Sequence, residues 1–384
     1  MKIADRITNL PPYVFATVEK RIAAARAKGV DVINLGIGSP DLKPAQFIID
    51  ALYTSVNRAD THGYAGYYGT PDLRKAIANY YERRFGVTLD PANEVRPLIG
   101  SKEGLANMAL AFVDPGDLVL ASDPGYPTYR MGAMMAGGES YAMPLLEEND
   151  YLVDFEAIPS AAAERATLMW LNYPNNPTGA GATMEFLERA VAYAARYDMV
   201  ICYDNPYCDL CFDGYVAPSI LEVPGAKEVC VEFNSLSKTY NMAGWRVGMA
   251  VGNAQALEAL TTIKTNIDSG IFRPLQDASV VALNGDQSWL AERNMIYQHR
   301  RDIVMDWTAK LGMTAHKPQG GLYVWAKVPA GQDCESYALG KLENAGVWLT
   351  PGTAFGQHGD GYLRISICVP EEQLIQAGER LLAI

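Results

Sequence analysis

The sequence predicts an α/β protein with a large, mostly parallel sheet covered by helices on both faces, and a smaller α+β region. Three observations favour this fold class. Apolar strand-like runs alternate with helical runs through the middle of the chain, which is typical of a parallel sheet. Near residue 288 the pattern changes to a long helix followed by strands in hairpin or meander style. The 384 residues, 49% hydrophobic and 20% charged, are enough for a large core or two lobes.

The N-terminal part contains two expected helices and one short strand. Apolar residues at helical spacing over 13–28 predict a helix that ends at Gly29, and VINLGIGSPD is typical of a strand that runs into a loop. Thr70 and Pro71 have the residue types of a helix cap and a first helical position. The apolar face of that helix is formed by Leu73, Ile77, Tyr80 and Tyr81.

Five strand-like runs build the expected sheet. They are DLVLASDP, ATLMWLNYP, MVICYDNPY, EVCVEFNSLS and WRVGMAVG. Helices are interleaved with them, and the helix expected over 183–197 has an apolar face of Phe186, Leu187, Ala190, Val191 and Ala194. Ligand sites of such sheets lie in the loops beyond the carboxyl ends of the strands, so we expect the chemistry there.

The C-terminal region predicts a helix over 288–311, the strands GGLYVWAKV, VWLTPG and LRISICV, and a final helix. The N-terminal segment is expected to join this smaller region. We therefore expect residues 1–45 to form an N-terminal arm and part of the small domain. Residues 46–285 are expected to form the large domain and 286–384 the small C-terminal domain.

Composition argues against several classes of protein. The formal charge is -12, from 32 basic and 44 acidic residues without a basic run, so nucleic acid and anionic membranes are unexpected partners. MKIADRITNLPPY is unlike a secretion signal, and no run of about 18 apolar residues predicts a membrane span, so we expect a cytoplasmic protein. Cys208 and Cys211 form a C-x-x-C without a second cysteine or histidine pair nearby, and no metal site is expected.

Two motifs predict contacts with a planar, phosphorylated ligand. In GSKEG, which runs into a helix, Ser101, Lys102 and main-chain N–H groups form a cup for a phosphate. In DPGYPTY, Tyr126 ends up where its ring would lie flat over a planar ligand. Taken alone, Gly-Ser before a helix is more typical of an ordinary helix cap. Taken alone, Tyr126 is more typical of a core or surface tyrosine.

Two further motifs follow predicted strands. NYPNNPTG forms a proline-braced turn that orients Asn176, although Asn, Pro and Gly are also the residues of plain turns. In YDNPY, Asp204 lies at the carboxyl end of a strongly apolar strand. A carboxylate there is costly unless it meets a cation or a donor, and a protonated ring nitrogen would serve.

The stretch SLSKTYNMAGWRVG combines an anion site with a lysine. Ser235, Ser237 and Arg246 can surround a phosphate, which leaves Lys238 to attack a carbonyl carbon. An amine is nucleophilic only when neutral, and cationic neighbours and desolvation both disfavour the ammonium form. The alternative is a solvated surface lysine.

Together these motifs resemble the fold-type I, class I and II aminotransferases that use pyridoxal 5′-phosphate, over nearly the whole chain and in the same order. The resemblance implies an aspartate aminotransferase-like fold, with a seven-stranded sheet and the cofactor in the large domain. It implies that Lys238 carries the cofactor and moves the proton at the substrate Cα, and that Asp204 pairs with the pyridine nitrogen. It also implies that Asn176 and Tyr207 bind the 3′ oxygen of the ring and that Tyr126 stacks on its face.

The same resemblance assigns the phosphate to Ser101, Lys102, Ser235, Ser237 and Arg246. Tyr64, in GYAGYYGTPDLR, matches a tyrosine that reaches the phosphate of the neighbouring subunit, which implies a homodimer. Arg364, in YLRIS, matches the arginine that binds the α-carboxylate of the substrate. Taken alone, an outward arginine on an edge strand is the ordinary interpretation of that residue.

For the substrate, NLPPYVFATVEKRI, LNYPNNPTGA, MPLLEENDYLVDFEAIP and IKTNIDSGIF look most like the LL-diaminopimelate aminotransferase group. This likeness implies amino transfer from LL-2,6-diaminopimelate to 2-oxoglutarate, in lysine biosynthesis. It implies a pocket lined by Tyr13, Gly38, Asn176 and Asn266, the last from the neighbouring subunit.

The plant and chlamydial members are longer and differ around the lysine, so the chain is similar to shorter bacterial relatives. Those relatives act on alanine, aspartate or aromatic amino acids, and no arginine near Asn266 matches the one that binds a distal carboxylate in aspartate-specific enzymes. The alternatives left open are these donors, a pyridoxal-phosphate lyase, and a non-catalytic domain like those of transcription regulators.

Overall fold

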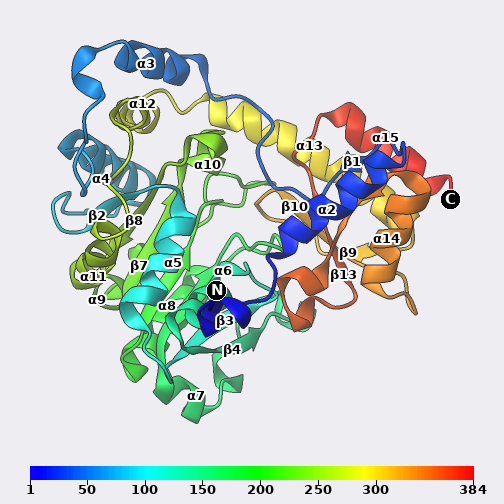
Figure 1. Ribbon diagram of the computed structural model, residues 1–384, viewed down its shortest axis with the longest axis horizontal. Helices are drawn as coiled ribbons and strands as arrows, with labels where there is room; N and C mark the ends of the chain where they lie inside the picture. Colours follow the sequence, from blue (N-terminus) through cyan, green and yellow to red (C-terminus); the bar gives the residue numbers. More distant parts are fainter.

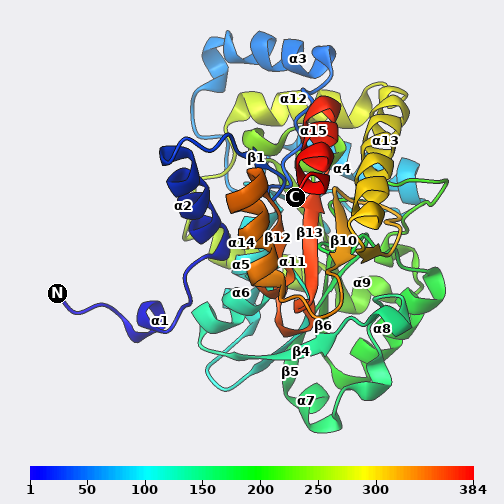
Figure 2. The same ribbon diagram turned by 90° about the vertical axis from the view of Figure 1, so that its right-hand side faces the viewer.

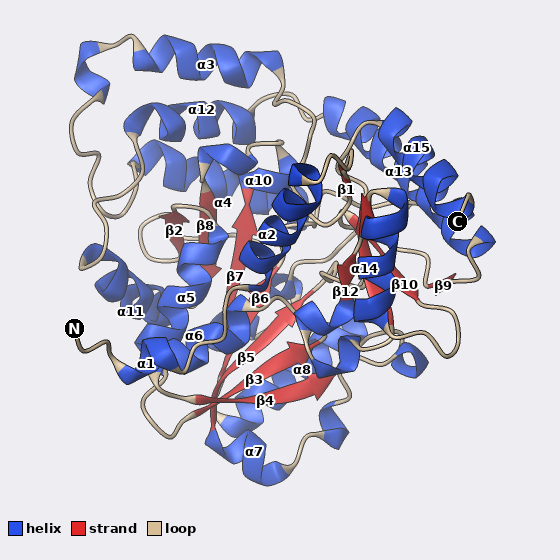
Figure 3. Ribbon diagram, turned by 45° about the vertical axis from the view of Figure 1, so that its right-hand side comes forward, coloured by secondary structure: helices blue, strands red, loops and turns tan.

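The computed structural model describes residues 1–384, apart from the side chain of Phe15. Its largest feature is a seven-stranded sheet with the strand order β2-β8-β7-β6-β5-β3-β4 (Figure 3). The strands are β2 (Val95–Leu98), β3 (Leu118–Asp123), β4 (Glu139–Pro144), β5 (Ala166–Asn172), β6 (Val200–Asp204), β7 (Cys230–Ser235) and β8 (Gly248–Gly252). β8 runs antiparallel to β2 and β7, and the other neighbours pair in parallel. The predicted mostly parallel sheet is confirmed.

Helices cover both faces of this sheet because successive strand residues point to opposite sides. In β5, Leu168 and Trp170 belong to one hydrophobic cluster, and Met169 and Leu171 belong to another. The first cluster includes side chains of α5 (Ser101–Phe112), α6 (Thr128–Ala136) and α11 (Ala254–Thr265). The second includes side chains of α3 (Gln46–Val56), α4 (Pro71–Phe85), α7 (Ser160–Arg165), α8 (Met184–Tyr197), α9 (Ala226–Val229) and α12 (Arg273–Asn284).

A smaller antiparallel sheet has the order β12-β13-β10-β9 and lies with three helices beside the large sheet (Figure 1). Its strands are β9 (Thr314–Ala315), β10 (Tyr323–Lys327), β12 (Thr350–Pro351) and β13 (Tyr362–Ser366). The helices are α13 (Trp289–Lys310), α14 (Cys334–Ala345) and α15 (Glu371–Leu382). The N-terminal segment joins this region, as expected, because β1 (Ile33–Asn34) pairs in parallel with β11 (Val347–Trp348). The division at residues 45 and 285 stays a prediction.

The remaining helices are α1 (Asp5–Thr8), α2 (Val14–Ala27) and α10 (Leu236–Thr239), with seven short 3-10 helices elsewhere. Figure 2 shows the segment before α2 extending away from the rest of the chain. Helix signals in the sequence worked as predicted: Thr70 Oγ1 accepts a hydrogen bond from the Leu73 N–H, and all five residues of the predicted α8 face are buried. Within the described part of the chain, every helix is too short or too polar to cross a membrane.

Candidate active site

A cavity of about 340 Å³ opens at the carboxyl ends of the central strands. Asn172, Asp204 and Ser235 are the last residues of β5, β6 and β7, and all three line it. Because these strands are parallel neighbours, their carboxyl ends meet at one edge of the sheet. The sequence-predicted residues that line the cavity are Tyr13, Gly38, Ser101, Lys102, Tyr126, Asn176, Asp204, Tyr207, Ser235, Ser237, Lys238, Arg246 and Arg364.

Asp204 presents one carboxylate oxygen without a hydrogen-bond partner among the described residues. Its Oδ2 accepts a hydrogen bond from Tyr129 Oη at 2.7 Å, whereas Oδ1 is buried and unsatisfied. Asn172 Nδ2 donates to the main-chain oxygen of Asp204 at 2.6 Å and fixes the end of the strand. Burial raises the pKa of Asp204 to about 7, although the Tyr129 hydrogen bond and the charge of Lys238 act in the opposite direction. A cationic donor in the cavity would satisfy Oδ1.

Lys238 is half-buried and points into the cavity, so it is not a solvated surface lysine. Its Nζ donates to the main-chain oxygen of Gly38 at 2.6 Å. Lys238 lies on the one-turn helix α10, which Ser235 Oγ caps by accepting a hydrogen bond from the Ser237 N–H. Lys238 Nζ lies 5.9 Å from the centre of the Tyr207 ring.

Five residues of the cavity have the composition of an anion site. Ser101 and Lys102 form the first turn of α5, and Ser235, Ser237 and Arg246 line the same cavity. Arg246 has a left-handed backbone with φ 57°, which is uncommon for a residue other than glycine. A Cβ atom on Gly100 would lie 2.1 Å from the Arg246 guanidinium, so glycine lets the arginine lie against the main chain. Three hydroxyl groups and two cations fit a phosphate dianion.

Arg364 is buried on an inner strand, because β13 lies between β12 and β10. It is therefore not the outward arginine of an edge strand. Its Nη2 donates to the main-chain oxygen of Gly36 at 2.7 Å, and its Nη1 donates to Asn176 Oδ1 at 2.9 Å. The guanidinium lies 4.0 Å from the centre of the Tyr323 ring and 4.4 Å from that of Phe355. Such a flat, pre-oriented guanidinium is suited to binding a carboxylate through two hydrogen bonds.

Two of the predicted residues lie outside this chain's own cavity. Tyr64 is 93% exposed, and Asn266 is exposed with its side chain bonded to the Thr262 main-chain oxygen. The resemblance implies that both serve the neighbouring subunit, and these positions agree with that prediction without testing it.

Four further residues of the site were not predicted from the sequence: Asn172, Glu19 and Tyr323, which line the cavity, and Tyr129, which donates a hydrogen bond to Asp204. Tyr129 ends the DPGYPTY motif and Asn172 begins the NYPNNPTG motif, so their positions were available as signals. Glu19 lies in NLPPYVFATVEKRI and Tyr323 lies in the predicted strand GGLYVWAKV, but neither residue was assigned to the site from these patterns, and both line the cavity. The cysteines of the C-x-x-C pair are not among the residues that line the cavity. Cys208 is buried, and its Sγ accepts a hydrogen bond from Asn234 Nδ2 at 3.2 Å. No three His, Cys, Asp or Glu side chains of the described residues are grouped to hold a metal ion.

The fold and the cavity bring a lysine, a buried carboxyl group, three hydroxyl groups and a buried arginine together at the carboxyl ends of the sheet strands. The family model for aminotransferase class I and II matches residues 30–381, so the chain belongs to this family. The chain is an aminotransferase, a transferase of nitrogenous groups. Members of this family depend on pyridoxal 5′-phosphate.

Proteins with similar sequences or structures match this chain over nearly its full length. The LL-diaminopimelate aminotransferase of Moorella thermoacetica is 50% identical over 381 residues, which is 99% of this chain and 98% of that protein. The LL-diaminopimelate aminotransferase of Desulforudis audaxviator is 50% identical over 378 residues, 98% of this chain and 96% of that protein. A substrate-bound BacF structure from Bacillus subtilis covers 100% of this chain and 98% of its own, with a TM-score of 0.95 and 39% identity. An aspartate aminotransferase mutant from Thermus thermophilus has a TM-score of 0.93 at 28% identity, covering 100% and 99%.

Proposed function

We propose that the chain transfers the amino group of LL-2,6-diaminopimelate to 2-oxoglutarate, as an LL-diaminopimelate aminotransferase of lysine biosynthesis. The observation that carries this proposal is the single cavity that joins Lys238, the free oxygen of Asp204 and the buried Arg364. Relatives with this name, 45–50% identical over nearly the whole chain, support the choice of substrate. The cavity supports the amino transfer, and the relatives support the choice of donor.

The residues of the cavity fit pyridoxal 5′-phosphate. In the proposal, the hydroxyl groups of Ser101, Ser235 and Ser237 and the cations of Lys102 and Arg246 bind the phosphate. Asp204 Oδ1, buried and unsatisfied, accepts the hydrogen bond of the protonated ring nitrogen. Asn176 and Tyr207 bind the ring's 3′ oxygen, and Tyr126 packs on the ring. The bound cofactor supplies an electron sink that stabilises negative charge at the substrate Cα.

Lys238 acts as the base that takes and returns the Cα proton. Its Nζ already lies inside the cavity, held by the Gly38 oxygen, and a neutral amine there has a lone pair available for the proton. Arg364 binds the α-carboxylate and fixes the substrate relative to Lys238, which restricts the bond that can break. Because Asn176 and Gly36 already orient the guanidinium, little conformational entropy is lost on binding.

The proposal includes a homodimer. Tyr64 and Asn266, outside their own cavity and exposed, are the residues through which each subunit completes the other site. The cytoplasmic location stays a prediction of the sequence.

A donor screen tests the substrate. Purified protein loaded with pyridoxal 5′-phosphate is given 2-oxoglutarate and one donor at a time: LL-diaminopimelate, alanine, aspartate, tyrosine or phenylalanine. Glutamate formation is measured, with Lys238→Ala as the inactive control. We expect kcat/KM for LL-diaminopimelate to exceed that of each other donor by about tenfold or more. A higher value for any of the other four donors would replace the proposed substrate, and ammonia with a 2-oxo acid in place of glutamate would indicate a lyase.

A further inference from the structure

Helix α13 carries three buried arginines behind the active site. Burying a cation is costly unless oxygen atoms compensate its charge. Arg300 and Arg301 form ion pairs, with Asp41 at 2.7 Å and Asp213 at 2.5 Å respectively. Arg293, only 3% exposed, differs because its guanidinium is directed mainly at main-chain oxygens. This difference raises the question of what Arg293 holds in place.

Arg293 binds the end of the short helix that carries Lys238. Its Nη1 donates to the main-chain oxygens of Lys238, at 2.8 Å, and of Thr239. Its Nη2 donates to the main-chain oxygen of Asp209 at 2.7 Å, as does Asn294 Nδ2 at 2.9 Å. The last carbonyl groups of a helix have no partner within it, and α10 has only four residues. Arg293 therefore supplies the C-terminal cap of α10 and joins it to the Asp209 loop.

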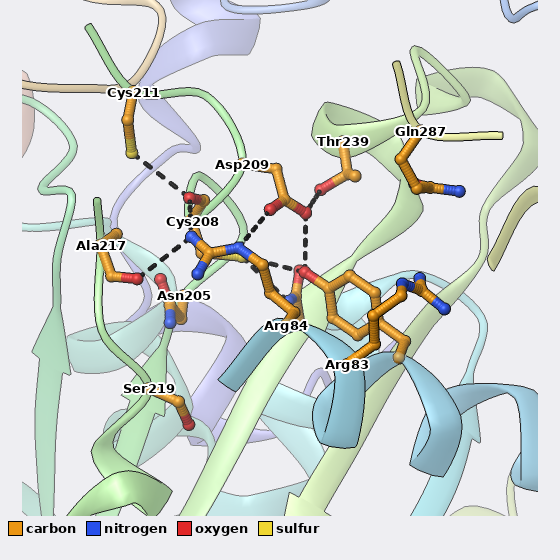
Figure 4. A network of polar contacts seen from close by, with 12 residues as sticks. Arg83, Arg84, Asn205, Cys208, Asp209, Cys211, Ala217, Ser219, Thr239 and Gln287 are labelled. Carbon is orange, nitrogen blue, oxygen red and sulfur yellow. Dashed lines mark hydrogen bonds and ion pairs between the residues drawn. The ribbon is translucent and has the colours of Figure 1, made fainter. Parts of the chain in front are cut away.

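The side chain of Asp209 also connects its loop to Thr239 (Figure 4). Its carboxylate accepts hydrogen bonds from Tyr80 Oη at 2.7 Å, Arg84 Nε at 2.9 Å and Thr239 Oγ1 at 3.2 Å. Asp209 lies in the loop that follows β6 and that also contains Tyr207. Thr239, the residue after Lys238, is thus tied to this loop by both its main chain and its side chain.

The same face of α13 also holds the loop that receives the Lys238 amine. Tyr297 Oη donates to Asp41 Oδ1 at 3.2 Å, and Arg300 binds both oxygens of the same carboxylate at 2.7 and 3.0 Å. Residues 293, 297 and 300 recur at helical spacing and share one face. Asp41 lies in the same loop as Gly38. The main-chain oxygen of Gly38 accepts the hydrogen bond of Lys238 Nζ at 2.6 Å. One helix face therefore fixes both the main chain and the amine of Lys238.

We propose that Arg293 is a positioning residue for Lys238, which sets where the amine lies in the cavity. Without the guanidinium, the main-chain oxygens of residues 209, 238 and 239 lose a buried donor, and the end of α10 is free to shift. The amine would then leave the Gly38 oxygen for part of the time. This inference rests on the proposed role of Lys238, but it makes a separate prediction about the cofactor-free protein.

The test measures how readily Lys238 is acetylated in cofactor-free protein. Wild type, Arg293→Met, Arg293→Lys and Arg301→Lys are treated with an acetylating reagent, and the modified peptides are quantified by mass spectrometry. Arg301 is the matched control, since it is fully buried on the same helix but binds Asp213, Asp302 and the Pro318 oxygen, away from α10. Exposed Lys327 serves as the internal standard for reagent reactivity.

We expect the acetylation rate of Lys238 to rise about fivefold in Arg293→Met, the factor that corresponds to one lost hydrogen bond. Arg293→Lys, which keeps the charge and one donor direction, should show a smaller rise. Arg301→Lys should lower the melting temperature while leaving the Lys238 rate at the wild-type value. If Arg293→Met does not fold, the test uses Arg293→Lys and also Arg300→Lys, which weakens the Asp41 contact. The Lys238 acetylation rate should then rise above the wild-type value in both variants.

Two results would overturn the inference. One is a Lys238 rate equal to wild type in the folded Arg293 variants, and the other is an equal rise in Arg301→Lys, which would indicate general loosening. Failure of the proposed function is recognised separately, by the absence of borohydride trapping of pyridoxal 5′-phosphate on Lys238 of the wild type. The acetylation rates are informative in either case because no cofactor is present.

Discussion

The buried carboxyl group of Asp204 predicts an unusual pH dependence of stability in the cofactor-free protein. Burial raises its pKa from 3.8 to about 7, so the folded protein binds a proton there across a range in which the unfolded chain has lost it. Stability then falls as the pH rises, because the folded state binds more protons. The contribution is fully present below pH 3.8 and is lost as the pH rises through about 7. Replacing Asp204 with Asn removes this titration while nearly preserving size.

The size of the effect follows from the two pKa values. For a single group with these two pKa values, the free energy of unfolding is about 2–3 kcal/mol lower at pH 8 than at pH 5. Glu232 provides an internal comparison. Burial also raises its pKa to about 7, and it accepts hydrogen bonds from Ser219, Tyr81 and Asn205, away from the residues that line the cavity. Asp204→Asn and Glu232→Gln should therefore each remove a similar share of the pH dependence.

Urea denaturation at pH 5 and pH 8, followed by circular dichroism, measures these differences in wild type and both variants. Added pyridoxal 5′-phosphate should reduce the part of the pH dependence of stability that Asp204 contributes, because a cationic ring nitrogen stabilises the carboxylate. The part that Glu232 contributes should not change. Parallel loss of stability in wild type and Asp204→Asn between the two pH values would refute the reasoning. So would a cofactor effect of equal size on the Glu232 share.

Three further predictions concern single side chains. Lys238→Ala should lose both turnover and the absorbance in the region of about 400 nm expected of the bound cofactor; a fully active variant would contradict the role of the lysine. Arg364→Lys should raise KM for every donor by about tenfold or more, because a two-pronged charged contact is lost, and an effect confined to one donor in the kinetic screen would argue against a general carboxylate site. Tyr129→Phe should weaken binding of pyridoxal 5′-phosphate about fivefold in equilibrium dialysis, since Asp204 Oδ2 loses its donor; unchanged affinity would show that this hydrogen bond does not support the site.

Local signals in the sequence were sufficient for the central part of the fold. The predicted runs ATLMWLNYP, MVICYDNPY and EVCVEFNSLS contain β5, β6 and β7, and each strand ends two or three residues before its run does. The two outer strands of the large sheet were missed for a physical reason. β2 is only VRPL, with a proline that an edge strand tolerates, and β4, ESYAMP, begins with exposed polar residues. All four residues of β2 are buried, but the strand is short and contains an arginine and a proline, and the exposed start of β4 weakens its apolar pattern.

Local sequence patterns could not predict the contacts between residues that are far apart in the chain. Arg364 was identified by its motif, but the hydrogen bond to the Gly36 oxygen spans 328 residues of sequence. Tyr323 packs on Arg364 although its predicted strand did not assign it to the site, and Glu19 reaches the cavity from α2. Residues of this kind are recognised only when the sheet topology brings the C-terminal strands against the N-terminal loop.

Gly36 and Gly38 explain why one N-terminal loop holds both the arginine and the lysine of the site. A Cβ atom on Gly38 would lie 1.7 Å from Tyr323 Oη, and one on Gly36 would lie 2.7 Å from the Trp348 ring. Only glycine therefore allows the loop to pack this closely, which places the Gly36 oxygen on Arg364 and the Gly38 oxygen on Lys238. Main-chain acceptors have no sequence signature, since any residue supplies a carbonyl group. The need for glycine at 36 and 38 follows from the packing against Trp348 and Tyr323. The main-chain oxygens of these two glycines in turn accept hydrogen bonds from the arginine and the lysine.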